Sequence, residues 1–421
     1  MNLSVFSLHC HVPRMALLFS CLFIALGLNA QSFDVGDLTY TVLQNDASAV
    51  QVTRGNKHFY DLTIPATVSY KDKSYTVKHI GNNAFYGNGY KIYHDVVLPP
   101  TIETIGAQAF TNNGDMTSVT FASGQAPRLR VIGEGAFYNC RKMTTLFEMP
   151  STLEEIGKGA FSGCWALRGT FLLPENLKTI GSECFSSCRS ISGFRFAFTS
   201  MADLLDGNRC LVNMRDDASW VCPVSIAPNV ERIPSYLFGS LGRYSVTFEP
   251  GSRCKEIAAY GLEYVGGRLE LPEGLVSIGS YAAYGTISGT PPLHLVLPST
   301  VQTIGNYAFR YCTSLSSLTC ARATPPAVYA NAFKNAADPS SCTLYVPLHC
   351  ASAYRGSNVW QQFFIEEADL TGISQPTVDD IDGSGSVKQR FGLGGQHLSS
   401  PTKGINIVRM SNGRVRKVVV K

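Results

Sequence analysis

The sequence predicts an α/β repeat solenoid with short parallel strands, an N-terminal β cap and a C-terminal β hairpin tail. Three observations lead to this fold class. A pattern of the form Ile-Gly-x-x-Ala-Phe recurs through the middle of the 421-residue chain. Short apolar runs that end in proline fall between the copies, and both ends of the chain lack the repeat. A fixed period of about 20 to 50 residues indicates stacked units that share one apolar core.

Residues 1–30 have the pattern of a secretory signal peptide. Arg14 precedes an apolar run from Met15 to Gly27, and the small Ala30 stands before the polar Gln31. The run is shorter than the roughly 20 apolar residues that a membrane span needs. We therefore expect cleavage after Ala30 and export of the mature chain.

Residues 31–77 are predicted to form an N-terminal β cap. Apolar and polar residues alternate in Leu38–Val42 and again in Ala49–Val52, with turn residues between them. Such alternation is typical of half-buried strands. A small antiparallel sheet would cover the apolar end and the open sheet edge of the first coil.

Residues 78–339 are predicted to form the solenoid, with about ten to eleven repeats. The copies follow one another at steps of 21 to 27 residues, except for one step of 53. That long step is about two periods, so a degenerate copy or an insertion is expected near residues 204–220. The copies begin at Ile80, Ile105, Ile132, Ile156, Ile180, Ile233, Ile257, Ile278 and Ile304, with a weak last copy at Val328.

Within each repeat, the apolar run reads as a brief strand that ends at proline, as in Val96–Pro99 and Leu295–Pro298. The Ile-Gly step turns the chain. The Ala-Phe pair is expected to begin a short helical or 3₁₀ turn whose phenylalanine fills the interior. Phe110, Phe137 and Phe161 should then lie one behind another along the axis.

The repeats Ile-Gly-x-x-Ala-Phe-x-x-Cys and Leu-Pro-x-x-Leu-x-x-Ile-Gly resemble the BspA-like (treponemal type) leucine-rich repeats of bacterial surface proteins. The resemblance covers roughly Ile80 to Phe333. It implies a surface protein that takes part in host-protein adhesion and contact between bacteria. The copies at Ile257 and Ile278 lack the phenylalanine, so the middle of the array departs from the pattern.

The C-terminal part divides into three segments by composition. Residues 340–370 are expected to cap the last coil, and residues 371–399, rich in Gly, Ser, Asp and Gln, read as a linker. In 400–421, Asn412-Gly413 between two apolar runs predicts a hairpin. This tail resembles a type IX (Por) secretion sorting domain, although Leu393-Gly-Gly395 departs from that family's usual Asp-Leu-Gln-Gly step. Whether the tail is cleaved, anchored or inactive in sorting stays open.

The cysteines are the first candidates for chemistry. Cys140, Cys164, Cys188 and Cys312 stand three residues after a phenylalanine, which favours a column of small buried thiols over a metal or disulfide ladder. Cys210 with Cys222, and Cys342 with Cys350, could form disulfides after export, but the pairing stays open.

No catalytic, cofactor or metal site is predicted. The sequence shows no Cys-x-x-Cys, His-Glu-x-x-His, Gly-x-Ser-x-Gly or phosphate-loop motif. A calcium loop beginning at Asp380 would place Phe391 at its twelfth position, where a carboxylate is needed. Glu154-Glu155 fall on a repeat turn and read as solvated charge. The net charge of +4 is too small to indicate nucleic acid.

These features predict an exported cell-surface adhesion or protein-binding scaffold, on the exterior of the outer membrane of a Gram-negative bacterium or secreted from it. The partner would be an extracellular protein or a cell-surface polymer, with membrane association only through export or anchoring. Two alternatives stay open: a glycan-capture protein that assists polysaccharide degradation, and a hydrolase with its site in residues 190–230. Candidate binding residues are aromatic residues of the repeat turns: Tyr86, Tyr90, Tyr138, Tyr281, Tyr284, Tyr307 and Tyr311.

Overall fold

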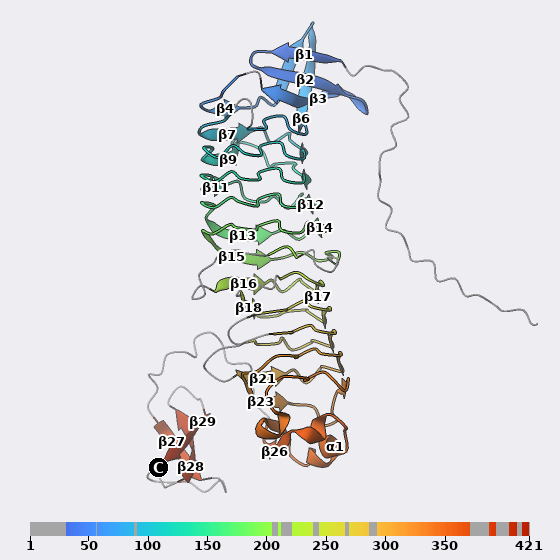
Figure 1. Ribbon diagram of the computed structural model, residues 1–421, viewed down its shortest axis with the longest axis vertical. Helices are drawn as coiled ribbons and strands as arrows, with labels where there is room; N and C mark the ends of the chain where they lie inside the picture. Colours follow the sequence, from blue (N-terminus) through green and yellow to red (C-terminus); the bar gives the residue numbers. More distant parts are fainter. Residues whose placement is uncertain are drawn as a thin grey trace, which may run out of the picture.

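The computed structural model confirms the predicted solenoid, a long stack of coils that Figure 1 shows from the side. The predicted signal peptide and residues 371–386 and 393–399 of the predicted linker lie outside the described residues. The structure describes residues 31–55, 57–87, 91–203, 209–211, 221–238, 244–265, 269–285 and 293–370, and the strands 387–392, 404–410 and 415–420.

Each coil has three sides. The first side is the strand formed by the apolar run that ends near proline. The second is a short strand that ends at the isoleucine of the repeat, and the third is the turn that carries Ala-Phe. Strands of successive coils pair in parallel, so that Ile105, Ile132 and Ile156 lie in register. A parallel hydrogen-bond ladder also runs along the third side, where Phe110 N–H donates to Ala136 O at 2.7 Å.

The strands of the first side form three four-stranded sheets, in the orders β11-β9-β7-β4, β13-β15-β16-β18 and β21-β23-β25-β26. Their bounds are β4 (Leu62–Thr63), β7 (Asp95–Leu98), β9 (Ser118–Phe121), β11 (Thr145–Leu146), β13 (Gly169–Leu173), β15 (Ile191–Phe196), β16 (Cys222–Ile226), β18 (Tyr244–Phe248), β21 (Leu293–Leu297), β23 (Leu315–Cys320), β25 (Thr343–Pro347) and β26 (Phe364–Ala368).

The strands of the second side form two sheets, one in each half of the solenoid. The first includes β6 (Lys73–Ile80), β8 (Thr104–Ile105), β10 (Val131–Ile132), β12 (Glu155–Ile156) and β14 (Thr179–Ile180). The second consists of β17 (Arg232–Ile233), β19 (Glu256–Ile257), β20 (Ser277–Ile278), β22 (Thr303–Ile304) and β24 (Ala327–Val328).

A coil lies within the 53-residue step, which agrees with the first of the two alternatives that the sequence left open, a degenerate copy. Glu183 N–H donates to Arg209 O at 2.7 Å, and Leu211 forms a parallel bridge with Phe238. Cys210 and Leu211 are both fully buried. This coil separates the two sheets of the second side, which end at β14 and resume at β17.

A column of stacked phenylalanines fills the interior of the N-terminal half. Phe85, Phe110, Phe137, Phe161 and Phe185 stack with ring centroids 5.2 to 5.4 Å apart. Phe110, Phe137 and Phe161 have no exposed surface, which confirms that the phenylalanine fills the core. The column is replaced by the buried side chains of Leu211, Leu262 and Ala283 in coils that lack the phenylalanine.

The glycine of the Ile-Gly step is required by the closeness of the neighbouring coil. A Cβ at Gly157 would lie 2.6 Å from the carbonyl carbon of Gly133 and 2.8 Å from the Cα of Glu134. Gly133 approaches the preceding coil in the same way, with a Cβ position 2.5 Å from Ala107 N. In these coils the two backbones therefore pass too close for a side chain, whereas Pro234 and Ala258 take the same position in the irregular middle of the array.

The Ala-Phe segments are hydrogen-bonded turns, and the short helical or 3₁₀ turn expected there is not formed in the coils that the structure describes. The reason is the backbone: positive φ values before and after the Ala-Phe pair interrupt any helical run. Helix in the described residues is confined to the C-terminal cap region, as η1 (Pro339–Ser341), α1 (Ala351–Arg355) and η2 (Trp360–Gln362).

An antiparallel sheet covers the N-terminal end. Strands β1 (Ser32–Val35), β2 (Leu38–Leu43) and β3 (Asp46–Gly55) form a meander, and β5 (Thr67–Tyr70) pairs with β6. Strand β3 also pairs in parallel with β6, and β4 with β7. Solenoid pairing therefore begins inside residues 31–77, where the sequence analysis expects only a cap.

At the other end, Trp360 is fully buried, and its indole N–H donates to Pro326 O at 3.0 Å. Its ring and that of Phe363 pack edge-on against Phe333, which closes the apolar column. The predicted tail hairpin is confirmed as the antiparallel pair β28 (Gly404–Met410) and β29 (Val415–Val420). A third strand, β27 (Val387–Gly392), pairs with β28 and falls inside the segment predicted as a linker.

Candidate binding face

In most coils, two positions of the turn adopt the left-handed conformation. One is two residues before the phenylalanine position, and the other is two residues after it. In the N-terminal half the first position holds Asn83, Gly135 and Gly159, which enter this conformation readily, and also Gln108 and Glu183, which do not. In the C-terminal half, tyrosine occupies most of these positions, with φ between 55 and 62°. The first position holds Tyr236, Tyr260, Tyr281 and Tyr307, and the second holds Tyr264 and Tyr311.

A bulky side chain in the left-handed region is strained by about 1 to 2 kcal/mol per residue. Six tyrosines in one half of the solenoid thus need a compensating interaction or a function. Part of the compensation is visible as ring stacking. The tyrosine ladder, defined as Tyr236, Tyr260, Tyr281 and Tyr307, stacks with centroids 4.6, 4.6 and 4.9 Å apart.

A second row of rings flanks the tyrosine ladder. Tyr264, Tyr284 and Tyr311 meet edge-to-face, with centroids 5.4 and 5.5 Å apart, and Tyr284 also contacts Tyr281. Six of these seven side chains are half-buried, and Tyr311 is exposed. Together the seven tyrosines form what we call the tyrosine face.

Cationic groups stand at both ends of the tyrosine face. The guanidinium of Arg310 lies 5.1 Å from the Tyr307 ring and 4.7 Å from the Tyr311 ring, and its Nη2 donates to Tyr311 Oη at 3.1 Å. Hydrogen bonds from Asn335 and then from Arg310 lower the pKa of Tyr311. Such cation–π contacts hold the charge in a defined place.

At the other end, Arg209 lies 5.4 Å from the ring of Tyr236. Its Nε and Nη2 donate to Oε2 of Glu263 at 2.9 and 2.7 Å. The Glu263 side chain is only 4% exposed, so this ion pair is largely removed from water. Removing one partner would leave the other charge buried and unpaired, which is unfavourable. The ion pair therefore holds Arg209 in place beside the ring of Tyr236.

The structure brings together four of the seven tyrosines predicted as candidates. Tyr281, Tyr284, Tyr307 and Tyr311 lie on the tyrosine face, whereas Tyr86 and Tyr138 belong to coils of the N-terminal half. Tyr90 lies outside the described residues. Sequence reasoning missed Tyr236, Tyr260, Tyr264 and Arg310. The signal was available, because Tyr236 and Tyr260 occupy the same repeat position as Tyr281 and Tyr307.

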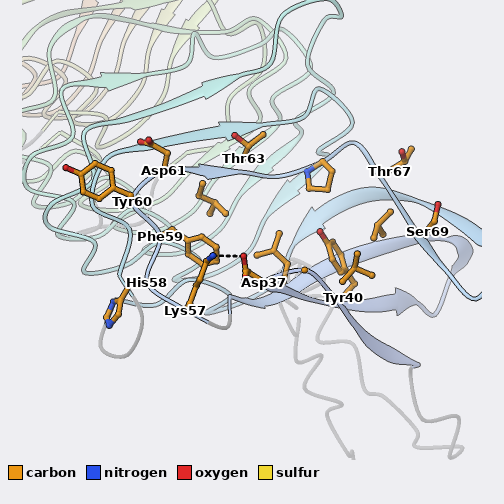
Figure 2. A pocket seen from close by; sticks show the side chains of 16 residues that line it. Asp37, Tyr40, Lys57, His58, Phe59, Tyr60, Asp61, Thr63, Thr67 and Ser69 are labelled. Atoms are coloured by element: carbon orange, nitrogen blue, oxygen red, sulfur yellow. Dashed lines mark ion pairs between the residues drawn. The ribbon is translucent and has the colours of Figure 1, made fainter.

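A separate groove of about 910 Å³ lies at the N-terminal cap, between the β1–β2 hairpin and residues 57–69. Figure 2 shows the ion pair between Lys57 Nζ and Asp37 Oδ2, at 2.6 Å, among its lining side chains. Tyr60 is 67% exposed and its ring packs on His94, with centroids 4.3 Å apart. Of the two carboxylates in the lining, Asp37 is paired with Lys57, and Asp61 accepts a hydrogen bond from Asp95 N–H at 3.2 Å.

The repeat cysteines satisfy backbone groups of the neighbouring coil. Cys140 Sγ donates to Phe110 O at 3.2 Å, and Cys164 and Cys188 donate in the same way one and two coils further on, each at 3.1 Å. Burial raises the pKa of Cys164 to about 12, so its thiol is unreactive at neutral pH. The column is structural, as the sequence analysis favours.

No disulfide forms among the cysteines that the structure describes. Cys210, Cys222 and Cys342 are buried and carry no disulfide bond, and Cys350 is partly exposed and carries none either. The two pairings left open by the sequence are therefore absent from this structure. Within the same described ranges, no group of three or more His, Cys, Asp or Glu side chains is placed to hold a metal ion.

Two described carboxylates, Glu154 on a repeat turn and Asp203 in the irregular middle, are engaged in ion pairs. Glu154 contacts Arg130 at 2.6 Å and Lys178 at 2.7 Å, so it joins three coils instead of standing in solvent alone. Hydrogen bonds from Lys178 and then Arg130 lower the pKa of Glu154. Asp203 accepts two hydrogen bonds from Arg232, at 2.8 and 2.9 Å.

Asn113 takes the cysteine position in its own coil, and its Nδ2 donates to Phe85 O at 2.7 Å. Three-sided coils, a stacked phenylalanine core and a cysteine or asparagine that hydrogen-bonds to the preceding coil define a leucine-rich-repeat solenoid. The family model described as "BspA type Leucine rich repeat region" matches residues 56–204 and 277–351, just over half of the chain. The chain belongs to this family. No curated protein matches it.

Solved structures of leucine-rich-repeat proteins resemble the chain distantly. One from Bacteroides ovatus is 22% identical, with a TM-score of 0.47 over 75% of this chain and 70% of that one. A leucine-rich cell surface protein from Faecalibacterium prausnitzii is 18% identical, with a TM-score of 0.32 over 81% and 95%. The pneumococcal vaccine antigen PcpA is 18% identical, with a TM-score of 0.36 over 81% and 98%.

Proposed function

We propose that this chain is an exported, non-catalytic scaffold at the bacterial surface that binds an extracellular protein through its tyrosine face. Export rests on the signal-peptide pattern of residues 1–30, and the tail from 400 is assigned to sorting through its resemblance to type IX secretion domains. In the part of the chain that the structure describes, no helix is both long and apolar enough to cross a bilayer. The BspA-type family supports a surface location.

The observation that carries the proposal is the concentration of strained tyrosines in one half of the solenoid. Six of them accept the left-handed conformation where the N-terminal coils use Asn, Gly or other residues. Tyrosine and arginine dominate the energetics of protein interfaces, because they combine a large apolar area with a polar end. The tyrosine face places both types on adjacent coils of a rigid support.

The orientation of the rings favours a protein over a neutral glycan as partner. In the tyrosine ladder each ring face is covered by the next ring, and the outer faces are covered by Arg209 at one end and Arg310 at the other. A sugar that stacks on an aromatic platform needs an open ring face. The tyrosine ladder instead offers ring edges and hydroxyl groups, which suit a mixed polar and apolar protein surface.

Binding of the mature chain, residues 31–421, to an array of extracellular matrix and bacterial surface proteins tests the proposal, with neutral polysaccharides on the same array. The test variant is the double substitution Tyr260→Asn and Tyr281→Asn. Asparagine tolerates the left-handed conformation and occupies the same position at Asn83. The matched control is Tyr60→Asn, which removes a tyrosine that is 67% exposed on the N-terminal cap.

We expect a protein ligand whose affinity falls at least about tenfold in the double variant and less than about twofold in the control. The melting temperature of the double variant should stay close to that of the parent. A ligand whose affinity is unchanged by the double substitution would refute the assignment of the face. Release of reducing sugar from a polysaccharide on the array would refute the non-catalytic reading.

A further inference from the structure

The C-terminal end of the tyrosine face carries two adjacent positive charges. Arg310 and Lys334 each follow directly after the phenylalanine of their coil, so they occupy one repeat position in two successive coils. Phe309 N–H donates to Ala332 O at 2.9 Å, which shows that the two turns are paired. Because neighbouring coils lie about 4.8 Å apart, the two like charges start from adjacent points of the backbone.

Both cations contact the same aromatic ring. The guanidinium carbon of Arg310 lies 5.1 Å from the ring centroid of Tyr307, and Lys334 Nζ lies 6.0 Å from it. Arg310 also lies 4.7 Å from the ring of Tyr311. Within the described ranges, no carboxylate forms an ion pair with either cation. The rings therefore hold the two charges in place without neutralising them.

The guanidinium of Arg310 is also incompletely hydrogen-bonded. Its Nη2 donates to Tyr311 Oη, which is a neutral acceptor. Its Nε is buried and has no hydrogen-bond partner, and among the described residues no other buried side-chain nitrogen or oxygen lacks one. A buried donor without an acceptor is unfavourable and calls for an explanation. The fold thus leaves much of the hydrogen-bonding capacity of this arginine unused.

A charge column on the second side of the solenoid shows the arrangement that stability alone favours. Glu154 there contacts Arg130 at 2.6 Å and Lys178 at 2.7 Å, so opposite charges alternate from coil to coil. Arg310 and Lys334 break this rule, because they place like charges on adjacent coils, and like charges that stand opposite each other are destabilising. The pair is therefore suited to an anion that comes from a partner.

We propose that Arg310 and Lys334 bind a carboxylate of the extracellular protein that the tyrosine face recognises; this inference rests on the proposed function and names the chemistry of its partner. The partner presents an aspartate or glutamate next to an apolar or aromatic side chain, because Tyr311 is 39% exposed beside the two cations. The guanidinium donates to the carboxylate through Nη1 and Nη2, since Nε is covered. The ammonium group of Lys334 supplies the second positive charge.

The short length of the positive region favours a protein segment over a sulfated polysaccharide. The two cations span two coils, a length on the order of 5 Å along the axis of the solenoid. At the other end of the tyrosine face, Arg209 is already paired with Glu263. A densely sulfated polymer is bound by a long row of cations, whereas one or two carboxylates suffice for this pair. The tyrosine edges and hydroxyl groups nearby suit a mixed protein surface.

A random copolymer of glutamate and tyrosine is a suitable probe, because it combines carboxylates with aromatic rings. Binding to the full mature chain, residues 31–421, is measured by calorimetry. The comparison ligands are heparin and the same copolymer after conversion of its carboxyl groups to amides. The test variant is Arg310→Gln, which removes the charge and keeps a polar side chain. The matched control is Arg253→Gln, which removes an exposed arginine from another coil.

We expect the copolymer to bind the parent chain, with affinity at least about tenfold lower in Arg310→Gln and less than about twofold lower in the control. Lys334→Gln should weaken binding several-fold, because a point charge is lost without the guanidinium fork. Melting temperatures show whether a variant is folded. If Arg310→Gln were unstable, Lys334→Gln would decide the test, because this side chain is exposed.

Two results would overturn the inference. Equal losses in Arg310→Gln and Arg253→Gln, or no loss in a folded Lys334→Gln variant when Arg310→Gln is unstable, would overturn the site. Binding of the amidated copolymer as tight as that of the parent copolymer, or tighter binding of heparin, would overturn the ligand class.

Failure of this inference can be told apart from failure of the proposed function. The double variant Tyr260→Asn, Tyr281→Asn leaves Arg310 and Lys334 unchanged. An array protein that depends on the two tyrosines but not on Arg310 would leave the proposed function standing and overturn the carboxylate site. Copolymer binding that is lost in Arg310→Gln, with no array protein that depends on the two tyrosines, would support the carboxylate site and overturn the proposed function.

Discussion

Substitution of Gly157 by alanine should break the contact between two coils. The added Cβ would lie 2.6 Å from the carbonyl carbon of Gly133 and 2.8 Å from the Cα of Glu134, and both are backbone atoms that cannot rotate away. Favourable carbon contacts need about 3.5 to 4.0 Å, so the coils must separate by about 1 Å. That shift also strains the hydrogen bond from Gly157 N–H to Ile132 O, now 2.7 Å.

The expected cost is about 3 kcal/mol or more, at the upper end of overpacking effects. Two other glycines distinguish the close approach of the backbones from other reasons why a glycine-to-alanine substitution could destabilise the fold. Gly159 has φ of +57° and a Cβ position no closer than 3.8 Å to its surroundings, so alanine there should cost about 1 to 2 kcal/mol from backbone strain alone. Gly114 has neither feature, with 3.8 Å to its nearest neighbour, and alanine there should change stability by less than about 0.5 kcal/mol.

The three variants can be compared by urea denaturation, followed by far-ultraviolet circular dichroism, and by their melting temperatures. The predicted order of destabilisation is Gly157→Ala, then Gly159→Ala, then Gly114→Ala. If Gly157→Ala unfolded at the same urea concentration as Gly114→Ala, the close approach of the coils would not be the reason for the Ile-Gly step.

Three further predictions concern the core, the charges and the thiols. Phe137→Ala should lower the free energy of unfolding by about 3 to 5 kcal/mol, because it opens a gap in the stacked column. The neighbouring substitution Tyr138→Ala should cost far less, because that side chain is 43% exposed. Similar losses in the two variants would contradict the core assignment. Because the pKa of Glu154 is lowered by Lys178 and Arg130, its ion pairs stabilise the fold above the ordinary glutamate pKa and lose their effect as the pH falls through the lowered value. Glu154→Gln should therefore lower the melting temperature at neutral pH but not in strong acid, and a difference that persists in acid would disprove the linkage. A maleimide should modify Cys350 in the native mature chain, because this thiol is partly exposed. It should modify the buried cysteines only after denaturation, namely Cys140, Cys164 and Cys188. Mass spectrometry identifies the labelled residues, and rapid labelling of these three cysteines in the native chain would contradict their burial.

The ion pairs of Glu154 belong to a column that the repeat itself creates. The residue two places before each isoleucine is Lys78, Glu103, Arg130, Glu154 and Lys178 in successive coils, so the sign of the charge alternates. Lys78 contacts Glu103 at 3.4 Å, and Glu154 contacts both of its neighbours. Each exposed pair contributes little, but the alternation favours the correct register of coils over a shift by one repeat.

Much of the fold was determined by the sequence alone, because the apolar positions recur at nearly the same spacing in each coil. The phenylalanine column, the parallel strands, the cysteine column and even the coil within the 53-residue step follow from that period. The tail hairpin followed from Asn412-Gly413, a local turn signal. These features depend on contacts between a coil and its immediate neighbour, which a periodic sequence specifies directly.

Only the tertiary structure decided which exposed residues meet and why certain residues are required. The period alone does not reveal that the Ile-Gly glycine is needed for close backbone approach, or that the Ala-Phe turn contains left-handed positions instead of a helix. The separation of Tyr86 and Tyr138 from the tyrosine face, and the stacking of Arg141 and Arg189 on Trp165, likewise required coordinates. Which side chains share a surface depends on the direction of each side chain and the distance between coils, and these are set when the whole stack packs together.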